Sequence, residues 1–317
     1  MSALGYLCLA CGADATTSAT VTGATSSSSD ATGAEEAPTS GEPVSTGSSS
    51  SATEAGVTTT NATTTNATGG STTTGDFPGE PVVLVERCFR CREIVLDETH
   101  VYFTALGPTN TVNAGVLAKI SKLGGAVTTL AKELVGPNDL VLRDGTIFWV
   151  DSKRGVIERV SSEGDDYALI ASGLMLPTDV DVDGLHVYWV DAGQANAHNG
   201  SLARAPIGGG PPEELLAGLD QPQMIALLGD SVVWVEGTAL RAMPTAGGAA
   251  WTVASEQVNP WTLVAGTDDL LYWANKGETL ATGSIQRIDL LGGAVEGLVT
   301  GLNVPWDLAL EDRKSVV

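Results

Sequence analysis

Short apolar runs return about every 42 residues along the second part of the chain. Each run contains an aromatic residue and ends next to an acid, an amide or a threonine. The clear copies are residues 147–151 (IFWVD), 187–191 (VYWVD) and 271–275 (LYWAN), and the weaker ones are 101–104 (VYFT) and 232–236 (VVWVE). A fixed period of this length, with short apolar segments split by Gly-rich turns, is typical of a β-propeller, in which each repeat is a four-stranded sheet.

Each repeat predicts four strands in a fixed register. A proline stands twelve or thirteen residues before the tryptophan of most repeats, and an aliphatic residue three positions after it marks the first strand. A tight turn such as Asp144-Gly145 leads to the aromatic second strand, which is apolar on both sides because neighbouring blades cover both faces. The third strand begins after a glycine and carries a basic residue four positions on. A glycine turn then leads to the fourth strand.

The two ends of the repeat region predict a sixth, incomplete blade. Cys91 takes the position that proline has in the other repeats, and Leu84 fits the register of a fourth strand. We therefore expect residues 82–85 to form the outer strand of a blade whose first strand begins at Pro305. Joining the termini would remove exposed sheet edges. The expected fold class is all-β, a six-bladed β-propeller with five complete blades and a sixth assembled from both termini.

The repeats resemble the YWTD repeats of the low-density-lipoprotein-receptor type (class B), a family of six-bladed β-propellers. The resemblance covers residues 82–317 and is most specific at Tyr188-Trp189-Val190-Asp191 with the downstream Leu-x-Arg; no copy has threonine before its acid. Bacterial lipoproteins of the myxobacterial type, which carry such repeats after a Ser/Thr-rich stalk, also look similar. The resemblance implies a non-enzymatic binding or scaffold module of the cell envelope.

Composition divides the chain at about residue 80. Residues 12–80 are rich in Ser, Thr, Gly and acids, and the first basic residue is Arg87. Such a segment buries too little apolar surface to fold, so we expect a disordered linker before a propeller domain at 81–317. The whole chain has 16 Lys and Arg against 38 Asp and Glu, a net charge of −22. This charge argues against nucleic-acid partners, and no apolar run is long enough for a membrane span.

The first eleven residues look like the remnant of a lipoprotein signal. A short apolar stretch ends in Cys11-Gly12 and is followed by the polar linker. This pattern predicts lipidation of Cys11 and an extracytoplasmic location, either as an outer-membrane or cell-surface lipoprotein or in the periplasm. Membrane contact would then occur only through the lipid anchor. The alternative is an ordinary N-terminus of a soluble protein.

Candidate chemistry gathers at one repeat position, two residues after the proline position. Four of its six occupants are carboxylates: Glu93, Asp139, Asp179 and Asp307. Around the axial channel they could hold Ca²⁺, which would favour a hydrolase of the propeller-lactonase type as the alternative function. The other interpretation is local capping of the backbone, with no cofactor. The acids that end each second strand and the bases of each third strand recur in every blade, so we expect them to be structural pairs rather than catalytic residues.

Three further features bear on function. Cys88 and Cys91 are expected to form a local disulfide, as suits an exported protein. Trp261 and Trp306 each follow a proline on the face that also carries long, variable loops, so they are candidates for a recognition surface, or else pack between blades. We expect a monomer that binds an unknown protein or glycan at the cell envelope.

Overall fold

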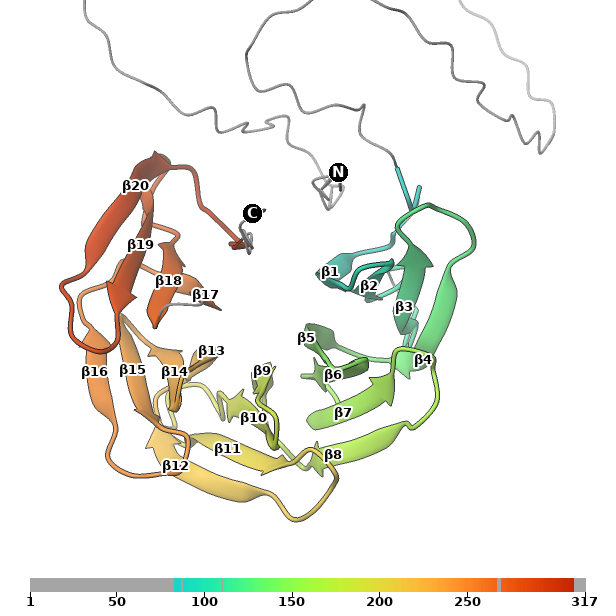
Figure 1. The fold of residues 1–317 in the computed structure, drawn as a ribbon, viewed down its shortest axis with the longest axis horizontal. Coiled ribbons are helices and arrows are strands. Elements are labelled where there is room, and N and C mark those ends of the chain that lie inside the picture. The colour runs from blue at the N-terminus through green and yellow to red at the C-terminus, as the bar shows by residue number, and fades with distance from the viewer. Residues whose placement is uncertain (1–82, 87, 110, 267–268, 311–317) are drawn as a thin grey trace, which may run out of the picture. The chain divides into compact units, whose positions relative to one another are not determined.

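The computed structural model describes residues 83–86, 88–109, 111–266 and 269–310, all of which belong to one compact unit. These residues form twenty strands in five separate four-stranded sheets and no helix. Figure 1 shows the sheets arranged as blades around a common axis. The predicted β-propeller with five complete blades is confirmed.

The strands of each blade follow one another in chain order from the centre of the ring to its rim (Figure 1). Blade 1 contains β1 (Cys91–Leu96), β2 (His100–Ala105), β3 (Gly115–Ser121) and β4 (Thr128–Leu134). Blade 2 contains β5 (Pro137–Arg143), β6 (Thr146–Asp151), β7 (Val156–Ser161) and β8 (Ala168–Ser172). Blade 3 contains β9 (Pro177–Val182), β10 (His186–Asp191), β11 (Gly200–Pro206) and β12 (Glu213–Leu219). Blade 4 contains β13 (Gln223–Leu228), β14 (Ser231–Glu236), β15 (Ala239–Pro244) and β16 (Trp251–Ala254). Blade 5 contains β17 (Pro260–Ala265), β18 (Leu270–Asn275), β19 (Gly283–Asp289) and β20 (Glu296–Leu302).

The core lies between the blades, and the aromatic second strands supply most of it. The tryptophans of blades 2 to 5, which are Trp149, Trp189, Trp234 and Trp273, are at most 1% exposed. One apolar cluster combines Phe148 of blade 2 with Trp189 of blade 3, so each interface is built from both neighbours. Because a large aromatic side chain buries 150–250 Å², these residues dominate the packing energy.

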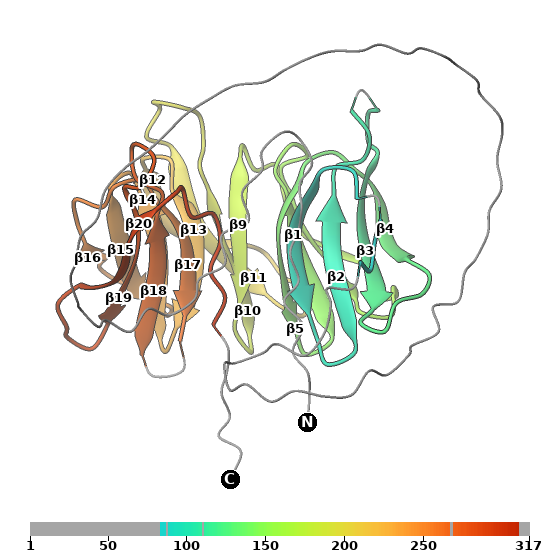
Figure 2. The ribbon, with the colours of Figure 1, turned by 90° about the horizontal axis from the view of Figure 1, so that it is seen from above.

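The innermost strands surround the axis and contact one another in sequence, β1 with β5, β5 with β9, β9 with β13, and β13 with β17. Figure 2 shows the ring from the side, with the strands running roughly parallel to the direction from which Figure 1 is viewed. Proline is tolerated as the first residue of β5, β9 and β17 because an edge strand does not need every N–H for the ladder. The inner edge of each blade therefore presents backbone groups that need other partners.

The prediction for the two ends of the ring is wrong in one respect. Residues 83–86 form no strand, and neither do residues 303–310; Val82 lies outside the described residues. Leu84 and Val85 instead pack against the blade 1 core cluster that contains Val101 and Phe103. The physical reason is the strand order: the first and fourth strands of a blade never pair with each other, because the second and third strands lie between them.

The predicted signal remnant (residues 1–11), the linker (12–80) and Cys11 lie outside the described residues. Within the described part of the chain, no helix is long and apolar enough to cross a membrane.

Candidate functional site

The axial carboxylates serve first as caps for the inner edges of the blades. Asp139 on β5 accepts a hydrogen bond from the Val180 N–H of β9 at 3.1 Å. Asp179 on β9 accepts one from the Ile225 N–H of β13 at 2.8 Å. Each carboxylate thus reaches from its own blade to the backbone of the next one, which satisfies donors that the ladder leaves free.

A further residue, which the repeat analysis did not single out, makes the same kind of contact. Asp181 lies two positions beyond Asp179 on β9, and it accepts a hydrogen bond from the Leu227 N–H of β13 at 2.7 Å. Burial raises the pKa of Asp181 to about 6, although its backbone hydrogen bonds oppose the shift. The alternation of side chains along a strand puts both aspartates on the same side of β9. The pattern Asp-Val-Asp could have indicated this.

The carboxylates interact closely enough to shift their pKa values upward. Burial raises the pKa of Asp139, and burial together with the charge of Asp139 raises the pKa of Asp179 well above its ordinary value. Burial, reinforced by the charges of Asp139 and Asp307, raises the pKa of Glu93 to about 8. A buried group of like charges favours bound protons, which is the physical cause of these upward shifts.

Whether these residues suit a metal ion can be judged from their arrangement. Asp307 lies 3.5 Å from the Thr262 hydroxyl through Oδ1 and also accepts the Leu308 N–H, so it is placed beside blade 5. The structure brings Asp139 and Asp179 into contact, with Glu93 and Asp307 within electrostatic range. In the described residues, however, no three Asp, Glu, His or Cys side chains come close enough together to hold a metal ion.

The acids that end the second strands also cap backbone groups, at the loops that lead into the first strands. Asp151 is fully buried and accepts the N–H groups of Val135 and Gly136, both at 2.9 Å, and that of Arg154 at 3.1 Å. Asp191 repeats the first two contacts with the residues before Pro177. The expectation that these acids are structural agrees with this geometry, but their main partners are backbone N–H groups rather than the recurrent bases.

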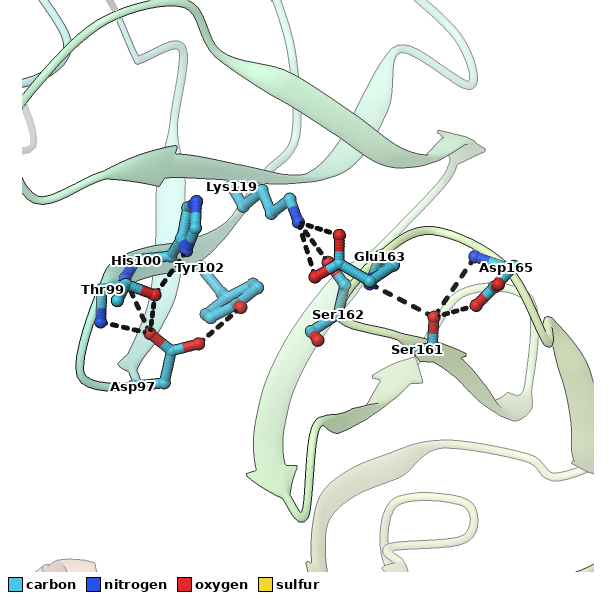
Figure 3. Close-up of polar contacts among 9 residues, drawn as sticks. All are labelled: Asp97, Thr99, His100, Tyr102, Lys119, Ser161, Ser162, Glu163 and Asp165. Atoms are coloured by element: carbon cyan, nitrogen blue, oxygen red, sulfur yellow. Dashed lines mark hydrogen bonds and ion pairs between the residues drawn. The ribbon is translucent and has the colours of Figure 1, made fainter.

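The recurrent bases bind elsewhere, at the outer parts of the blades. Lys119 of blade 1 reaches blade 2, where its Nζ donates to the Ser162 carbonyl at 2.6 Å and lies 3.3 Å from the Glu163 carboxylate (Figure 3). Figure 3 also shows Asp97 in the turn before β2, where its carboxylate accepts hydrogen bonds from the Thr99 and Tyr102 side chains. These contacts fix the neighbouring blades and turns relative to each other.

Trp261 and Trp306 form the core of an exposed cluster on one face of the ring. Their rings meet edge to face with centroids 5.8 Å apart. The ammonium of Lys276, the first residue after β18, lies 3.0 Å from the Trp261 ring centroid and 3.5 Å from that of Trp306. Burial lowers the pKa of Lys276 to about 8. Trp306 is 64% exposed, so the cluster is open to solvent.

Lys276 was not foreseen from the repeats, because it belongs to a loop whose length varies between blades. Its position directly after a second strand, on the same face as the two tryptophans, was the available signal. A cation held between aromatic rings is an attractive arrangement that also fixes the rings in place. We refer to Trp261, Trp306 and Lys276 as the tryptophan cluster.

Cys88 and Cys91 are joined by a disulfide, with their Cα atoms 5.6 Å apart. Cys91 is the buried first residue of β1, and Cys88 packs against the same apolar cluster of blade 1. The bridge therefore closes the turn through which the chain enters the propeller. Arg90, within this turn, has a φ of 58° and is exposed.

An ion pair between exposed Arg154 and buried Glu158 in blade 2 was also missed by the sequence analysis. Glu158 on β7 is fully buried, and each of its oxygens lies 3.0 Å from a terminal nitrogen of Arg154. The Tyr167 hydroxyl donates to the same carboxylate. Since a buried charge needs several partners, Arg154 and Tyr167 are held in fixed positions at the boundary with blade 1.

One comparison with a solved structure supports the fold. A chain of the nidogen/laminin complex matches with a TM-score of 0.51 and 21% identity, over 68% of this chain and 78% of that chain. A streptogramin B lyase structure matches with a TM-score of 0.48 and 16% identity, over 69% of this chain and 68% of that chain. No protein-family model and no curated protein matches the sequence. At such low identity the first likeness concerns the β-propeller fold alone.

Proposed function

We propose that this protein is a non-enzymatic binding or scaffold module of the cell envelope, and that its ligand docks on the tryptophan cluster. The observation that carries the proposal is the exposure of Trp306 beside Trp261 and Lys276. Tryptophan supplies a large apolar surface with one polar N–H, which is why it is enriched where proteins recognise partners. A protein or a glycan at the envelope would suit this surface.

The placement of the acidic residues supports a binding role over catalysis. Asp139, Asp179 and Asp181 each accept a backbone N–H of the next blade, and Asp151 and Asp191 cap loops. A catalytic acid or base must be free to reach a substrate. These carboxylates are instead committed to holding the ring together.

The remaining parts of the proposal rest on the sequence. The repeats resemble YWTD repeats, and the stretch before Cys11 resembles a lipoprotein signal. We propose an extracytoplasmic monomer, attached to a membrane through lipid on Cys11 and separated from it by the Ser/Thr-rich linker. Mass spectrometry of the mature protein tests this directly: an unmodified Cys11, or intact sequence upstream of it, would contradict the anchor.

The tryptophan cluster can be tested with matched variants of the full chain. Immobilised wild-type protein is exposed to an envelope extract and to a glycan array, and the retained partner is compared with that of Trp306→Ala and Trp261→Ala. Trp251→Ala is the control, because Trp251 is also partly exposed but lies on the outermost strand of blade 4. We expect the cluster variants to lose the partner and the control to keep it. Equal retention by all four proteins would refute the docking site.

The alternative function, a metal-dependent propeller hydrolase, depends on the axial carboxylates. Within the described residues no three of the side chains His, Cys, Asp and Glu form a group that could hold a metal ion, so we expect the melting temperature of the wild type to stay unchanged across millimolar Ca²⁺. A rise that disappears in Asp139→Asn but persists in Asp181→Asn would restore the hydrolase hypothesis. The two variants are matched because each aspartate caps one N–H of the following blade.

A further inference from the structure

A groove runs along the boundary between blades 1 and 2. A pocket of ≈ 530 Å³ is lined by the last part of β4 together with Arg154 and Tyr167 of blade 2. A second pocket of ≈ 240 Å³ adjoins it, because Asn113 and Val135 line both. The second pocket extends toward the loop between β2 and β3 and toward Arg90. The result is an elongated depression, separate from the tryptophan cluster.

Positive charge collects in this groove although the protein is strongly acidic. Arg90, Lys132 and Lys153 line it, and all three are exposed. Within the described residues none of these three side chains forms an ion pair. The lining contains one acid, Glu133. In a chain with a net charge of −22, three unpaired cations along one groove mark a place where an anion is locally favoured.

Contacts with residues inside the blades hold the walls of the groove in place. Buried Glu158 holds Arg154 through both of its oxygens and accepts the Tyr167 hydroxyl. The stem of Lys153 lies against Gly136, where a Cβ atom would approach Lys153 Cγ to 2.7 Å. A side chain at position 136 would therefore displace Lys153. Preformed walls reduce the entropy that a ligand must lose to bind.

Apolar groups lie between the cations and narrow the class of ligand. Leu130 and Ala131 of β4 line the first pocket, and Leu106, Val112 and Ala114 line the second. A bare inorganic anion would leave these groups unused. An extended peptide places successive side chains on opposite sides, so carboxylates can face the cations while small apolar side chains face the leucines.

We propose that this groove binds an extended acidic peptide segment of a partner protein, with its Asp or Glu side chains on Arg90, Lys132 and Lys153. Such binding weakens as salt rises, because the cations are exposed and are screened over about 10 Å at 0.1 M salt. The proposal is independent of the docking site on the tryptophan cluster, since the two sites share no residue.

The test uses the full chain and a fluorescein-labelled peptide of alternating Asp and Ala, followed by fluorescence anisotropy at low salt. We expect Lys132→Gln and Lys153→Gln each to weaken binding about twofold to fivefold, the size of an exposed ion pair. Combined charge reversal of Arg90, Lys132 and Lys153 should abolish it. Lys122→Glu is the matched control, because Lys122 is an exposed base of blade 1 outside the groove.

Several outcomes separate the proposal from its competitors. Binding that is unaffected by the triple reversal, or weakened equally by Lys122→Glu, would reduce the effect to general electrostatics and overturn the site. Binding of an oligogalacturonate of equal charge without binding of the peptide would reassign the groove to an acidic glycan. Trp306→Ala should leave peptide binding unchanged, so failure here and failure of the tryptophan-cluster proposal can be told apart.

Discussion

Replacement of Asp151 by alanine should be among the most damaging single changes in the propeller. The carboxylate is fully buried and accepts three backbone N–H groups, from Val135, Gly136 and Arg154. The first two bonds hold the loop that carries the chain from blade 1 into blade 2, and the third holds the loop between β6 and β7. Without the carboxylate, the three donors lose their partner in a place that water reaches poorly.

The magnitude follows from the cost of unpaired donors. A buried polar group without a partner costs ~1–3 kcal/mol, so three of them set an upper range of roughly 3–9 kcal/mol. Relaxation of the loop and entry of water reduce this figure, and removal of one partner from a buried charged network costs roughly 3–5 kcal/mol. We expect a loss of about 4 kcal/mol. In a domain of this size ~1 kcal/mol moves the melting temperature by ~2–4 °C, so the midpoint should fall by roughly 8–16 °C.

Blade 5 supplies the matched control, because the same position holds Asn275. Its side-chain nitrogen donates to the Gln257 side-chain oxygen at 3.0 Å, and the Trp273 indole donates to that oxygen as well. Here the Gln257 oxygen accepts two side-chain donors, and an aspartate at position 275 would bring two acceptor oxygens together in place of a donor and an acceptor. We expect Asn275→Asp to destabilise the domain, whereas Asp151→Asn should cost less than Asp151→Ala because one acceptor oxygen remains.

The assay is urea unfolding followed by tryptophan fluorescence, at a pH where the wild type unfolds reversibly. The reasoning is refuted if Asp151→Ala costs less than about 1 kcal/mol with an unchanged m-value, since the loop would then not depend on the carboxylate. A gain in stability for Asn275→Asp would contradict the assignment of hydrogen-bond roles in blade 5.

Further predictions concern pH and backbone conformation. The pKa of Glu93 is raised to about 8 in the folded state, so the folded protein holds a proton that the unfolded chain releases above its ordinary pKa of 4.5. The free energy of unfolding should therefore fall as pH rises between these two values. Glu93→Gln should flatten this dependence of stability on pH. Glu133 and Glu256 have φ values of 62° and 58° at a position that is glycine in the other blades. Replacing either residue by glycine should stabilise the domain by roughly 1 kcal/mol in thermal unfolding. No gain in stability would argue against backbone strain at these positions. Gly155 has a φ of 65° and its Cβ would clash with the Leu174 carbonyl, so Gly155→Ala should cost at least about 2 kcal/mol; a neutral effect in the same assay would show that the turn rearranges.

The repeat pattern predicted the blades because equivalent residues of each copy lie in the same structural environment. The tryptophans of the second strands recur at one position, and burial between two blades is the only environment that suits them all. The fourth strand expected at residues 82–85 had no such support. Its aliphatic spacing matched, but pairing needs a third strand beside it, and spacing alone carries no information about a partner strand.

The candidate sites were harder to predict for a related reason. The contacts of Lys276 and Glu158 depend on residues that occur once, so no comparison between repeats marks them. The repeat position picked out the carboxylates, but what each carboxylate does depends on which neighbour lies within reach. Only the structure shows that the Asp179 carboxylate meets the Ile225 N–H.

The bonds between blades share a direction. Asn138, Asp139 and Asp179 contact main-chain atoms of the following blade with their side chains, and Lys119 and Arg204 do the same near the rim. For these bonds the receiving blade contributes mainly its peptide groups, which any sequence possesses, although Lys119 also pairs with the Glu163 side chain. The polar contacts between blades therefore place few demands on the sequence of the following blade, whereas the apolar interface depends on side chains of both neighbours. Polar residues on the receiving surface of a blade could thus diverge without loss of these hydrogen bonds, as long as its backbone kept the same path.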